Sequence, residues 1–168
     1  MDSPVWLAFL VLCFFTVRCH SREGGHFQLD FDYAEFQSLL ELREHLQIEA
    51  FDVWPSNLDP CDQWYGVVCK EGHVIFLTLP PQIHATQHRE ANSLLSNESF
   101  LLDSVVSTLM KLPFLRSFNA SGFMFHGPIP STFSKLKRLE VLDLTSASLY
   151  GTIPLTFGDL SGLKFLSL

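Results

Sequence analysis

The sequence is poor in basic residues. Lysine and arginine together number 11, against 18 aspartates and glutamates, so the formal net charge at pH 7 is −7. Nucleic-acid binding needs a basic surface that neutralises phosphates, so this class of partner is disfavoured. The acidic excess lies mostly between Glu23 and Asp62, where a solvated acidic face is the simplest explanation.

Long apolar runs are also scarce. A membrane-spanning helix needs about 20 apolar residues, whereas the run from Val5 to Val17 has 13. It has no charge and begins close to the amino terminus, which is typical of a secretory signal peptide. The alternative, a buried core segment, would require a globular domain that starts at residue 1. We expect residues 1–21 to be a signal peptide, and a membrane anchor only in a segment absent from this chain.

Motifs for catalysis and for metal or cofactor binding are missing or incomplete. No serine stands in a Gly-x-Ser-x-Gly elbow, and no phosphate-cradling glycine loop or His-Arg-Asp loop occurs. His84 and His88 have a helix-compatible metal spacing, but the sequence offers no clear third ligand. We therefore expect no enzyme activity, no cofactor and no metal, and any kinase domain would lie beyond this chain.

Cysteine is rare as well, with 4 in the chain. The first two would leave with the signal peptide or sit at its edge, which leaves Cys61 and Cys69 as an even pair in an oxidising compartment. A disulfide between them would close a small loop and contribute about 2–3 kcal/mol. The sequons at Asn97 and Asn119 are consistent with the secretory route and are expected glycosylation sites.

What the sequence has in abundance is a leucine pattern that repeats every 24 residues. A Gly-x-Ile-Pro motif follows in the first two units, at residues 127–130 and 151–154. A fixed period of this length is the signature of a leucine-rich repeat. The three sets of apolar positions are Leu112, Leu115, Phe118, Ala120; Leu136, Leu139, Leu142, Leu144; and Leu160, Leu163, Leu166, Leu168.

Each unit predicts a short strand followed by a return segment. In a strand, Leu142 and Leu144 point to one face and Val141 and Asp143 to the other, so the leucines enter the core. We expect Gly-x-Ile-Pro to end the strand and turn the chain, with glycines in an unusual backbone conformation. The prolines would fix the return, which continues through a short helical or 3₁₀ segment.

The opposite strand face predicts a concave binding surface. Its small, polar and occasional apolar side chains suit contact with a peptide or a glycan. The alternative is that this part of the protein is only a scaffold, with ligands held by later repeats. The candidate residues are Ser117, Asn119, Ser121, Val141, Asp143, Thr145 and Phe165, with Phe76, Thr78 and Ser167 on the same face.

A cap precedes the repeats. An apolar helical face formed by Phe36, Leu39, Leu40 and Leu46, with Leu42 near its edge, predicts a helix. Asp30 or Asp32 would be its N-cap. A strand ending in Leu77 and Leu79 would match Leu142 and Leu144, and Trp54 and Trp64 would cover the open end of the leucine core. The alternative role of the two tryptophans is as ligand anchors.

The helix, the tryptophan, the stretch Asp59-Pro60-Cys61-Asp62-Gln63-Trp64-Tyr65-Gly66-Val67-Val68-Cys69 and the following strand resemble the plant-type leucine-rich-repeat amino-terminal domain. The Gly-x-Ile-Pro repeats are similar to those of plant receptor-like kinases, receptor-like proteins and polygalacturonase inhibitors. The resemblance covers residues 31–79 and 109–168. It implies recognition of peptides, steroids, cell-wall material or partner receptors on the concave or lateral surfaces.

Three features depart from this pattern. Phe123 and Ala147 replace the usual repeat asparagine, and we expect Phe123 to stack where amide bonds would otherwise run. Leu79 and Leu112 are 33 residues apart, so residues 80–100 are an insertion or a degenerate repeat. The chain also ends within a repeat strand, which predicts a truncated product, with a complete short protein as the alternative.

An amphipathic helix would rejoin the core through Leu101, Leu102, Val105, Val106 and Leu109.

The predicted fold is an α/β solenoid, a right-handed leucine-rich-repeat superhelix of short parallel strands with a helical, disulfide-bonded cap. Its parts would be a signal peptide (1–21), the cap (22–72), a first strand plus insertion (73–100) and the repeats (101–168). We expect an extracellular, cell-wall or outer plasma-membrane module that binds a peptide, glycan or protein, with a co-receptor as a further partner. It would form part of a receptor-like kinase or receptor-like protein; the alternatives are a secreted polygalacturonase-inhibitor-like binder and a non-functional truncated product.

Overall fold

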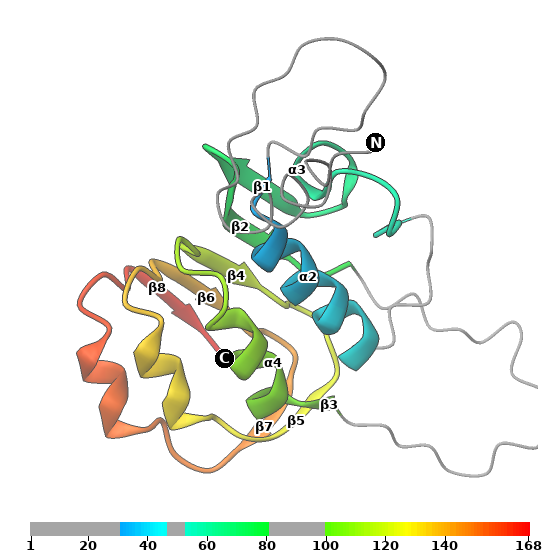
Figure 1. The fold of residues 1–168 in the computed structure, drawn as a ribbon. Coiled ribbons are helices and arrows are strands. Elements are labelled where there is room, and N and C mark those ends of the chain that lie inside the picture. Colours follow the sequence, from blue (N-terminus) through cyan, green and yellow to red (C-terminus); the bar gives the residue numbers. More distant parts are fainter. Residues whose placement is uncertain (1–30, 47–52, 81–99) are drawn as a thin grey trace, which may run out of the picture.

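The computed structural model describes residues 31–46, 53–80 and 100–168. The predicted signal peptide, the sequon at Asn97 and the pair His84 and His88 lie outside the described residues. The described chain winds into successive turns, each with a short strand on one side (Figure 1). The parallel pairing of the short repeat strands, which the leucine period predicts, is present.

The larger sheet has five strands in the order β1-β2-β4-β6-β8. β1 (Val67–Lys70) and β2 (His73–Thr78) form an antiparallel pair that belongs to the cap. β4 (Ser117–Asn119), β6 (Val141–Asp143) and β8 (Phe165–Ser167) then add in parallel, one from each repeat. Paired residues on neighbouring strands of this group are 24 positions apart in the sequence, which is the repeat period.

One face of this sheet carries the core. Leu77, Phe118 and Leu142 pair in register on neighbouring strands, and each is 0% exposed. Leu166 continues the row on β8 and is 37% exposed. The strand alternation predicted from the leucine period is therefore confirmed for these positions.

A second, three-stranded sheet lies across the core from the first, in the order β3-β5-β7. It consists of β3 (Phe100–Leu101), β5 (Phe125–Pro128) and β7 (Ser148–Tyr150). The expectation that Gly-x-Ile-Pro ends the concave strand was wrong, because β4 ends at Asn119 and Gly127 lies within β5. The unusual backbone of the glycines is confirmed, with φ of +121° at Gly127 and +87° at Gly151. Backbone pairing between equivalent segments of adjacent turns creates the second sheet.

The return segments contain short helices that stack side by side. η1 (Ser131–Lys135) and η2 (Leu155–Asp159) are 3₁₀ helices that begin directly after Pro130 and Pro154, as expected for a return fixed by proline. α4 (Leu102–Leu109) holds the same place one turn earlier. Contacts join α2 to α4, α4 to η1 and η1 to η2, so the helices form one continuous layer (Figure 1). The predicted amphipathic helix is confirmed from residue 102, whereas residue 101 belongs to β3.

The cap begins with α2 (Tyr33–His45), whose N-cap is Asp32. The Asp32 carboxylate accepts hydrogen bonds from the backbone N–H groups of Ala34 and Glu35, at 2.8 and 3.2 Å. Leu42 is 0% exposed and lies at the centre of the buried face, while Leu40 is only partly buried. The prediction had their positions reversed. The buried stripe runs through positions 35, 39, 42 and 46, which is ordinary helical spacing.

Candidate functional site

The outward face of the larger sheet carries two rows of side chains in register. The first row is Phe76, Ser117, Val141 and Phe165, and the second is Thr78, Asn119, Asp143 and Ser167. Neighbouring strands in a sheet lie about 4.8 Å apart, so each row is a regular ladder. The two phenylalanines at the ends of the first row are 43% and 51% exposed.

The structure brings most of the predicted concave candidates together in these rows. Ser117, Asn119, Val141, Asp143 and Phe165 all lie on the strands, with side chains on the face away from the leucine core. The remaining two candidates, Ser121 and Thr145, lie two residues beyond the ends of β4 and β6.

Local hydrogen bonds fix the second row. The Asn119 side-chain oxygen accepts from the Ser121 backbone N–H at 2.9 Å, and the Asp143 carboxylate accepts from the Thr145 N–H at 3.0 Å. The Thr145 hydroxyl also bonds to Asp143 and lies 2.6 Å from the Ser167 hydroxyl. Asn and Asp commonly bond to the backbone two residues on. The row is thus an ordered polar surface beside the partly apolar one.

The cap closes one end of the core with two stacked indoles. Trp54 is 0% exposed and Trp64 is 4% exposed, with ring centroids 5.3 Å apart. Their ring N–H groups donate to the carbonyls of Tyr65 and Pro55, at 2.8 and 2.9 Å. Burial and satisfied polar tips make both tryptophans structural, so a role as surface ligand anchors does not fit.

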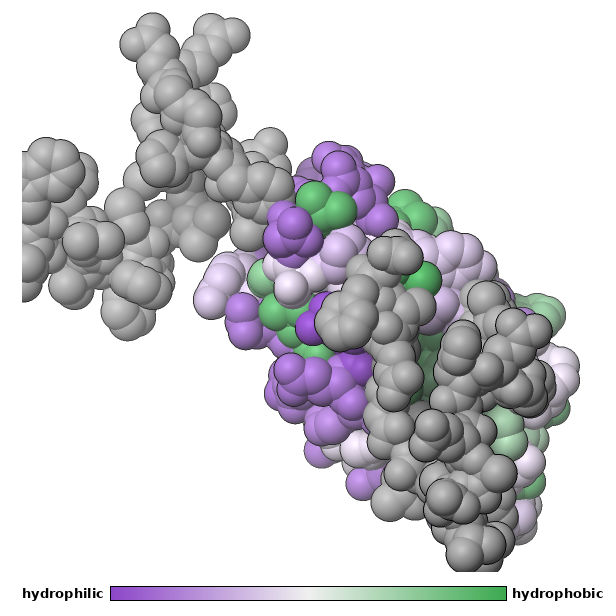
Figure 2. All heavy atoms as spheres, turned by 90° about the vertical axis from the view of Figure 1, so that its right-hand side faces the viewer, coloured by the Kyte–Doolittle hydropathy of each residue, from purple (hydrophilic) through white to green (hydrophobic). Residues whose placement is uncertain are grey.

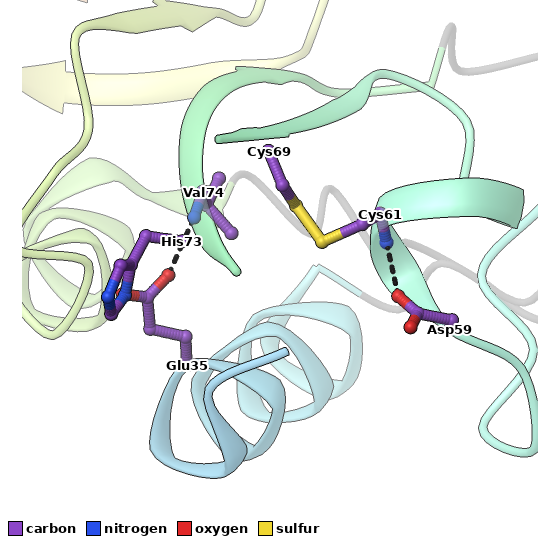
Figure 3. The surroundings of a disulfide bond; sticks show 6 residues. All are labelled: Glu35, Asp59, Cys61, Cys69, His73 and Val74. Atoms are coloured by element: carbon purple, nitrogen blue, oxygen red, sulfur yellow. Dashed lines mark hydrogen bonds and ion pairs between the residues drawn. A yellow bond between two sulfur atoms is a disulfide. The ribbon is translucent and has the colours of Figure 1, made fainter. Parts of the chain in front are cut away.

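The predicted disulfide between Cys61 and Cys69 is present (Figure 3). It joins α3 (Pro60–Gln63) to β1. Asp59 caps α3 by accepting from the Cys61 backbone N–H at 2.8 Å. Where grey atoms leave it visible, the described surface in Figure 2 is mainly hydrophilic, with scattered apolar residues. The disulfide therefore ties α3 to β1 within the cap that covers one end of the apolar core.

Sequence reasoning missed a buried carboxylate at the joint between the cap and the first strand. Glu35 is 2% exposed and accepts a hydrogen bond from the Val74 N–H at 2.8 Å, and its other oxygen lies 2.8 Å from Nδ1 of His73 (Figure 3). Burial raises the pKa of Glu35, while the bonds from Val74 and His73 oppose that rise. A glutamate on the apolar stripe of a helix was the available signal.

Phe123, which replaces the usual repeat asparagine, is 2% exposed. Its ring lies 5.0 Å from that of Phe125. Its backbone N–H donates to the Ala120 carbonyl at 3.0 Å. An aromatic contact thus occupies the expected asparagine position in this turn.

Within residues 31–46, 53–80 and 100–168, no three His, Cys, Asp or Glu side chains gather in a way that could hold a metal ion. Over the same residues, no helix has both the length and the apolar character needed to cross a bilayer.

Comparisons with known proteins agree with this architecture. Residues 32–70 match the family model described as leucine rich repeat N-terminal domain. A probable LRR receptor-like serine/threonine-protein kinase of Arabidopsis thaliana is 37% identical over 98 residues, which is 58% of this chain. The matched region is 10% of that relative, so the chain spans only a small part of the curated protein that it matches.

Two solved structures share the fold. The crystal structure of a plant ice-binding protein matches with a TM-score of 0.62 and 29% identity, over 83% of this chain and 41% of that one. The LRR ectodomain of the Arabidopsis receptor kinase HAESA, in complex with an N-terminally extended IDA peptide hormone, matches with a TM-score of 0.56 and 24% identity. This match covers 79% of this chain and 20% of that one. The cap and the repeats are thus of the leucine-rich-repeat type and resemble plant receptor ectodomains.

Proposed function

We propose that this chain is an extracellular ligand-recognition module, the amino-terminal part of the ectodomain of a plant receptor-like kinase or receptor-like protein. The observation that carries the proposal is the pair of in-register rows on β2, β4, β6 and β8. They present a partly apolar and a polar ladder side by side on one sheet. Such a surface contacts a partner along several strands without a deep cavity.

The chemistry of the rows favours a peptide or protein partner. Exposed aromatic rings at Phe76 and Phe165 are common anchors in protein recognition, and the hydroxyl and carboxylate groups of the second row offer hydrogen bonds to a backbone. The likeness to an ectodomain that holds a peptide hormone supports the same ligand class. A co-receptor is a further partner, and signalling chemistry would lie outside these residues.

The test uses the secreted full chain and a displayed peptide library. Peptides that bind are measured against Val141→Glu, which places a charge in the centre of the first row. The matched control is Leu155→Glu, the same apolar-to-acidic change on η2, where the side chain is 98% exposed and lies away from the sheet. We expect at least a tenfold loss of affinity for Val141→Glu and less than a twofold change for Leu155→Glu. Equal affinities for both variants would contradict the concave site.

A secreted binder of the cell wall, such as a polygalacturonase inhibitor, is the second candidate. The likeness to a plant ice-binding protein supports it, because that protein has a similar fold and binds a ligand other than a peptide. Sequencing of the full-length transcript separates the two candidates. A reading frame that continues into an apolar span of about 20 residues supports the receptor. A frame without such a span, together with inhibition of a polygalacturonase by the product, supports the secreted binder.

A further inference from the structure

A basic groove lies beside the first concave row. Its lining is Arg116, Lys137, Arg138, Glu140, Gly162 and Lys164, around an open hollow of about 300 Å³. Four cationic side chains thus face one carboxylate in a chain whose net charge is −7. A local basic cluster on an acidic protein is an electrostatic feature that favours an anionic partner.

The repeat itself builds the groove. Arg116, Glu140 and Lys164 are 24 residues apart and occupy the same position directly before β4, β6 and β8. The Glu140 N–H donates to the Arg116 carbonyl at 2.6 Å, and the Lys164 N–H donates to the Glu140 carbonyl at 2.7 Å. These bonds set the three residues side by side as a charged row next to the first concave row.

Glu140 orders two of the cations. One carboxylate oxygen lies 3.4 Å from Arg116 Nη1 and the other lies 2.6 Å from Lys164 Nζ. The hydrogen bond from Lys164 lowers the pKa of Glu140 most, and the nearby positive charges of Lys164 and Arg116 lower it further. The carboxylate therefore stays ionised and lies between the two cationic groups at the edge of the groove.

The other two cations contact neutral groups. Lys137 Nζ donates to the Asp159 carbonyl at 3.4 Å, and the Arg138 guanidinium lies 4.5 Å from the centre of the Phe114 ring. Within the described part of the chain, neither forms an ion pair with a carboxylate. Stacking on the ring positions the guanidinium and leaves its N–H groups able to pair with an incoming carboxylate.

A glycine keeps the groove open. Phe114, Arg138 and Gly162 are equivalent positions in three successive repeats, and the third has no side chain to cover the space. A Cβ placed on Gly162 would meet the Leu139 and Lys137 carbonyl oxygens at 3.5 and 3.8 Å, which is ordinary contact. A Cβ therefore fits at this position, and its absence in glycine leaves this part of the lining open.

We infer that this groove binds the side-chain carboxylates of an acidic peptide segment, whose apolar residues lie on the adjoining row of Phe76, Ser117, Val141 and Phe165. The neighbouring apolar row favours a peptide over a uniformly charged wall polymer, because only the peptide combines carboxylates with apolar side chains at short spacing. This inference rests on the proposed recognition function and assigns a charge to its ligand.

The test uses the full chain and two probes of equal charge. The first is an end-blocked synthetic peptide in which Asp and Glu alternate with Leu and Phe, and the second is an oligo-uronate. Arg138→Glu reverses a charge in the groove, and Gly162→Glu places a competing carboxylate inside it. The matched control is Lys135→Glu, which makes the same charge change as Arg138→Glu on an exposed residue of η1.

We expect the peptide to bind more tightly than the oligo-uronate, and its affinity to fall as salt is raised. Arg138→Glu and Gly162→Glu should weaken peptide binding at least tenfold, and Lys135→Glu less than twofold, with thermal melting confirming that every variant is folded. Three outcomes would overturn the inference: no peptide binding, equal sensitivity of all three variants, or tighter binding of the oligo-uronate. A partner of the concave face whose affinity survives Arg138→Glu would also overturn it, while the proposed concave site would stand.

Discussion

The cap and the repeats achieve the same end, a covered apolar core, by different physical means. The cap uses single contacts that occur once: a disulfide, two stacked indoles and a buried carboxylate. The repeats use one contact set that recurs with each turn, in which equivalent residues pair across parallel strands. Loss of a cap contact should therefore affect the whole described fold, whereas loss of a repeat contact should depend on how well that turn is covered.

The largest effect is expected from Trp54→Ala. The side chain is fully buried and hydrogen-bonded, so its removal leaves a large cavity and should cost about 3–5 kcal/mol. Tyr65→Ala is the control, because Tyr65 is 50% exposed and receives the Trp54 bond through its backbone. Urea unfolding measures both variants. A loss for Trp54→Ala no larger than that for Tyr65→Ala would contradict the role of the indole in the cap.

The same substitution at equivalent positions of two repeats sharpens the comparison. Leu142→Ala removes a side chain that is 0% exposed, and should cost about 2–5 kcal/mol. Leu166 pairs with Leu142 in register but is 37% exposed, so Leu166→Ala should cost less than about 2 kcal/mol. Chemical denaturation of the full chain gives both values. Equal losses would show that cover by the neighbouring turn does not decide the cost.

Removal of the disulfide is expected to have a smaller effect. Cys61→Ser combined with Cys69→Ser frees a loop with a sequence separation of 8, which should cost about 2–3 kcal/mol through the entropy of the unfolded chain. Mild reduction of the wild-type protein provides an independent comparison, since it breaks the same bond without a mutation. Unchanged melting of both samples would refute the stabilising role of this bond.

The N-cap of α2 offers a smaller and more local test. Asp32→Ala removes the acceptor of two backbone hydrogen bonds and should cost about 1 kcal/mol. Asp32→Asn retains an oxygen acceptor and should recover most of that loss. Thermal unfolding followed by circular dichroism resolves the pair, and equal losses for Ala and Asn would argue against capping.

Glu35 predicts a dependence on pH. Because burial raises its pKa in the folded protein, the folded state binds the proton more tightly than the unfolded chain, where the pKa is about 4.3. The contribution of Glu35 to stability is then fully present below that value and is lost as pH rises through the folded pKa. Glu35→Gln keeps an acceptor for Val74 and does not titrate, so wild type should lose stability relative to this variant as pH rises. A difference in stability between wild type and Glu35→Gln that does not change with pH would contradict the raised pKa of Glu35.

Local periodicity explains what could be predicted from the sequence. Strand alternation follows from backbone geometry, so Leu142 and Leu144 were assigned correctly to the core. The helix with an N-cap at Asp30 or Asp32, the disulfide and the role of the tryptophans were also predicted, since each has a short sequence signal, and the structure selects Asp32 as the cap. Of the concave candidates, the strand positions could be grouped on one face by the same alternation, although their binding role stays a prediction.

Apart from the exchanged positions of Leu40 and Leu42 on α2, the errors concern contacts between distant segments. β5 has the sequence Phe-His-Gly-Pro, which is a poor strand signal, and it becomes a strand by pairing with β3 on one side and β7 on the other. Glu35 is buried because it bonds to Val74, 39 positions away, and no local rule indicates such a partner. The charged row was visible as Arg116, Glu140 and Lys164 at the repeat spacing, but its meaning requires the groove that Arg138 and Gly162 form.

Site-specific photocrosslinking tests the central claim most directly. A benzophenone amino acid replaces Val141 in one sample of the secreted chain and Leu155 in the other, and both are irradiated on plant cell surfaces. A concave recognition site predicts a discrete peptide or protein adduct at position 141 that excess unlabelled chain suppresses, and no such adduct at position 155. The same adducts at both positions, or none at position 141, would contradict the assignment of ligand recognition to the larger sheet.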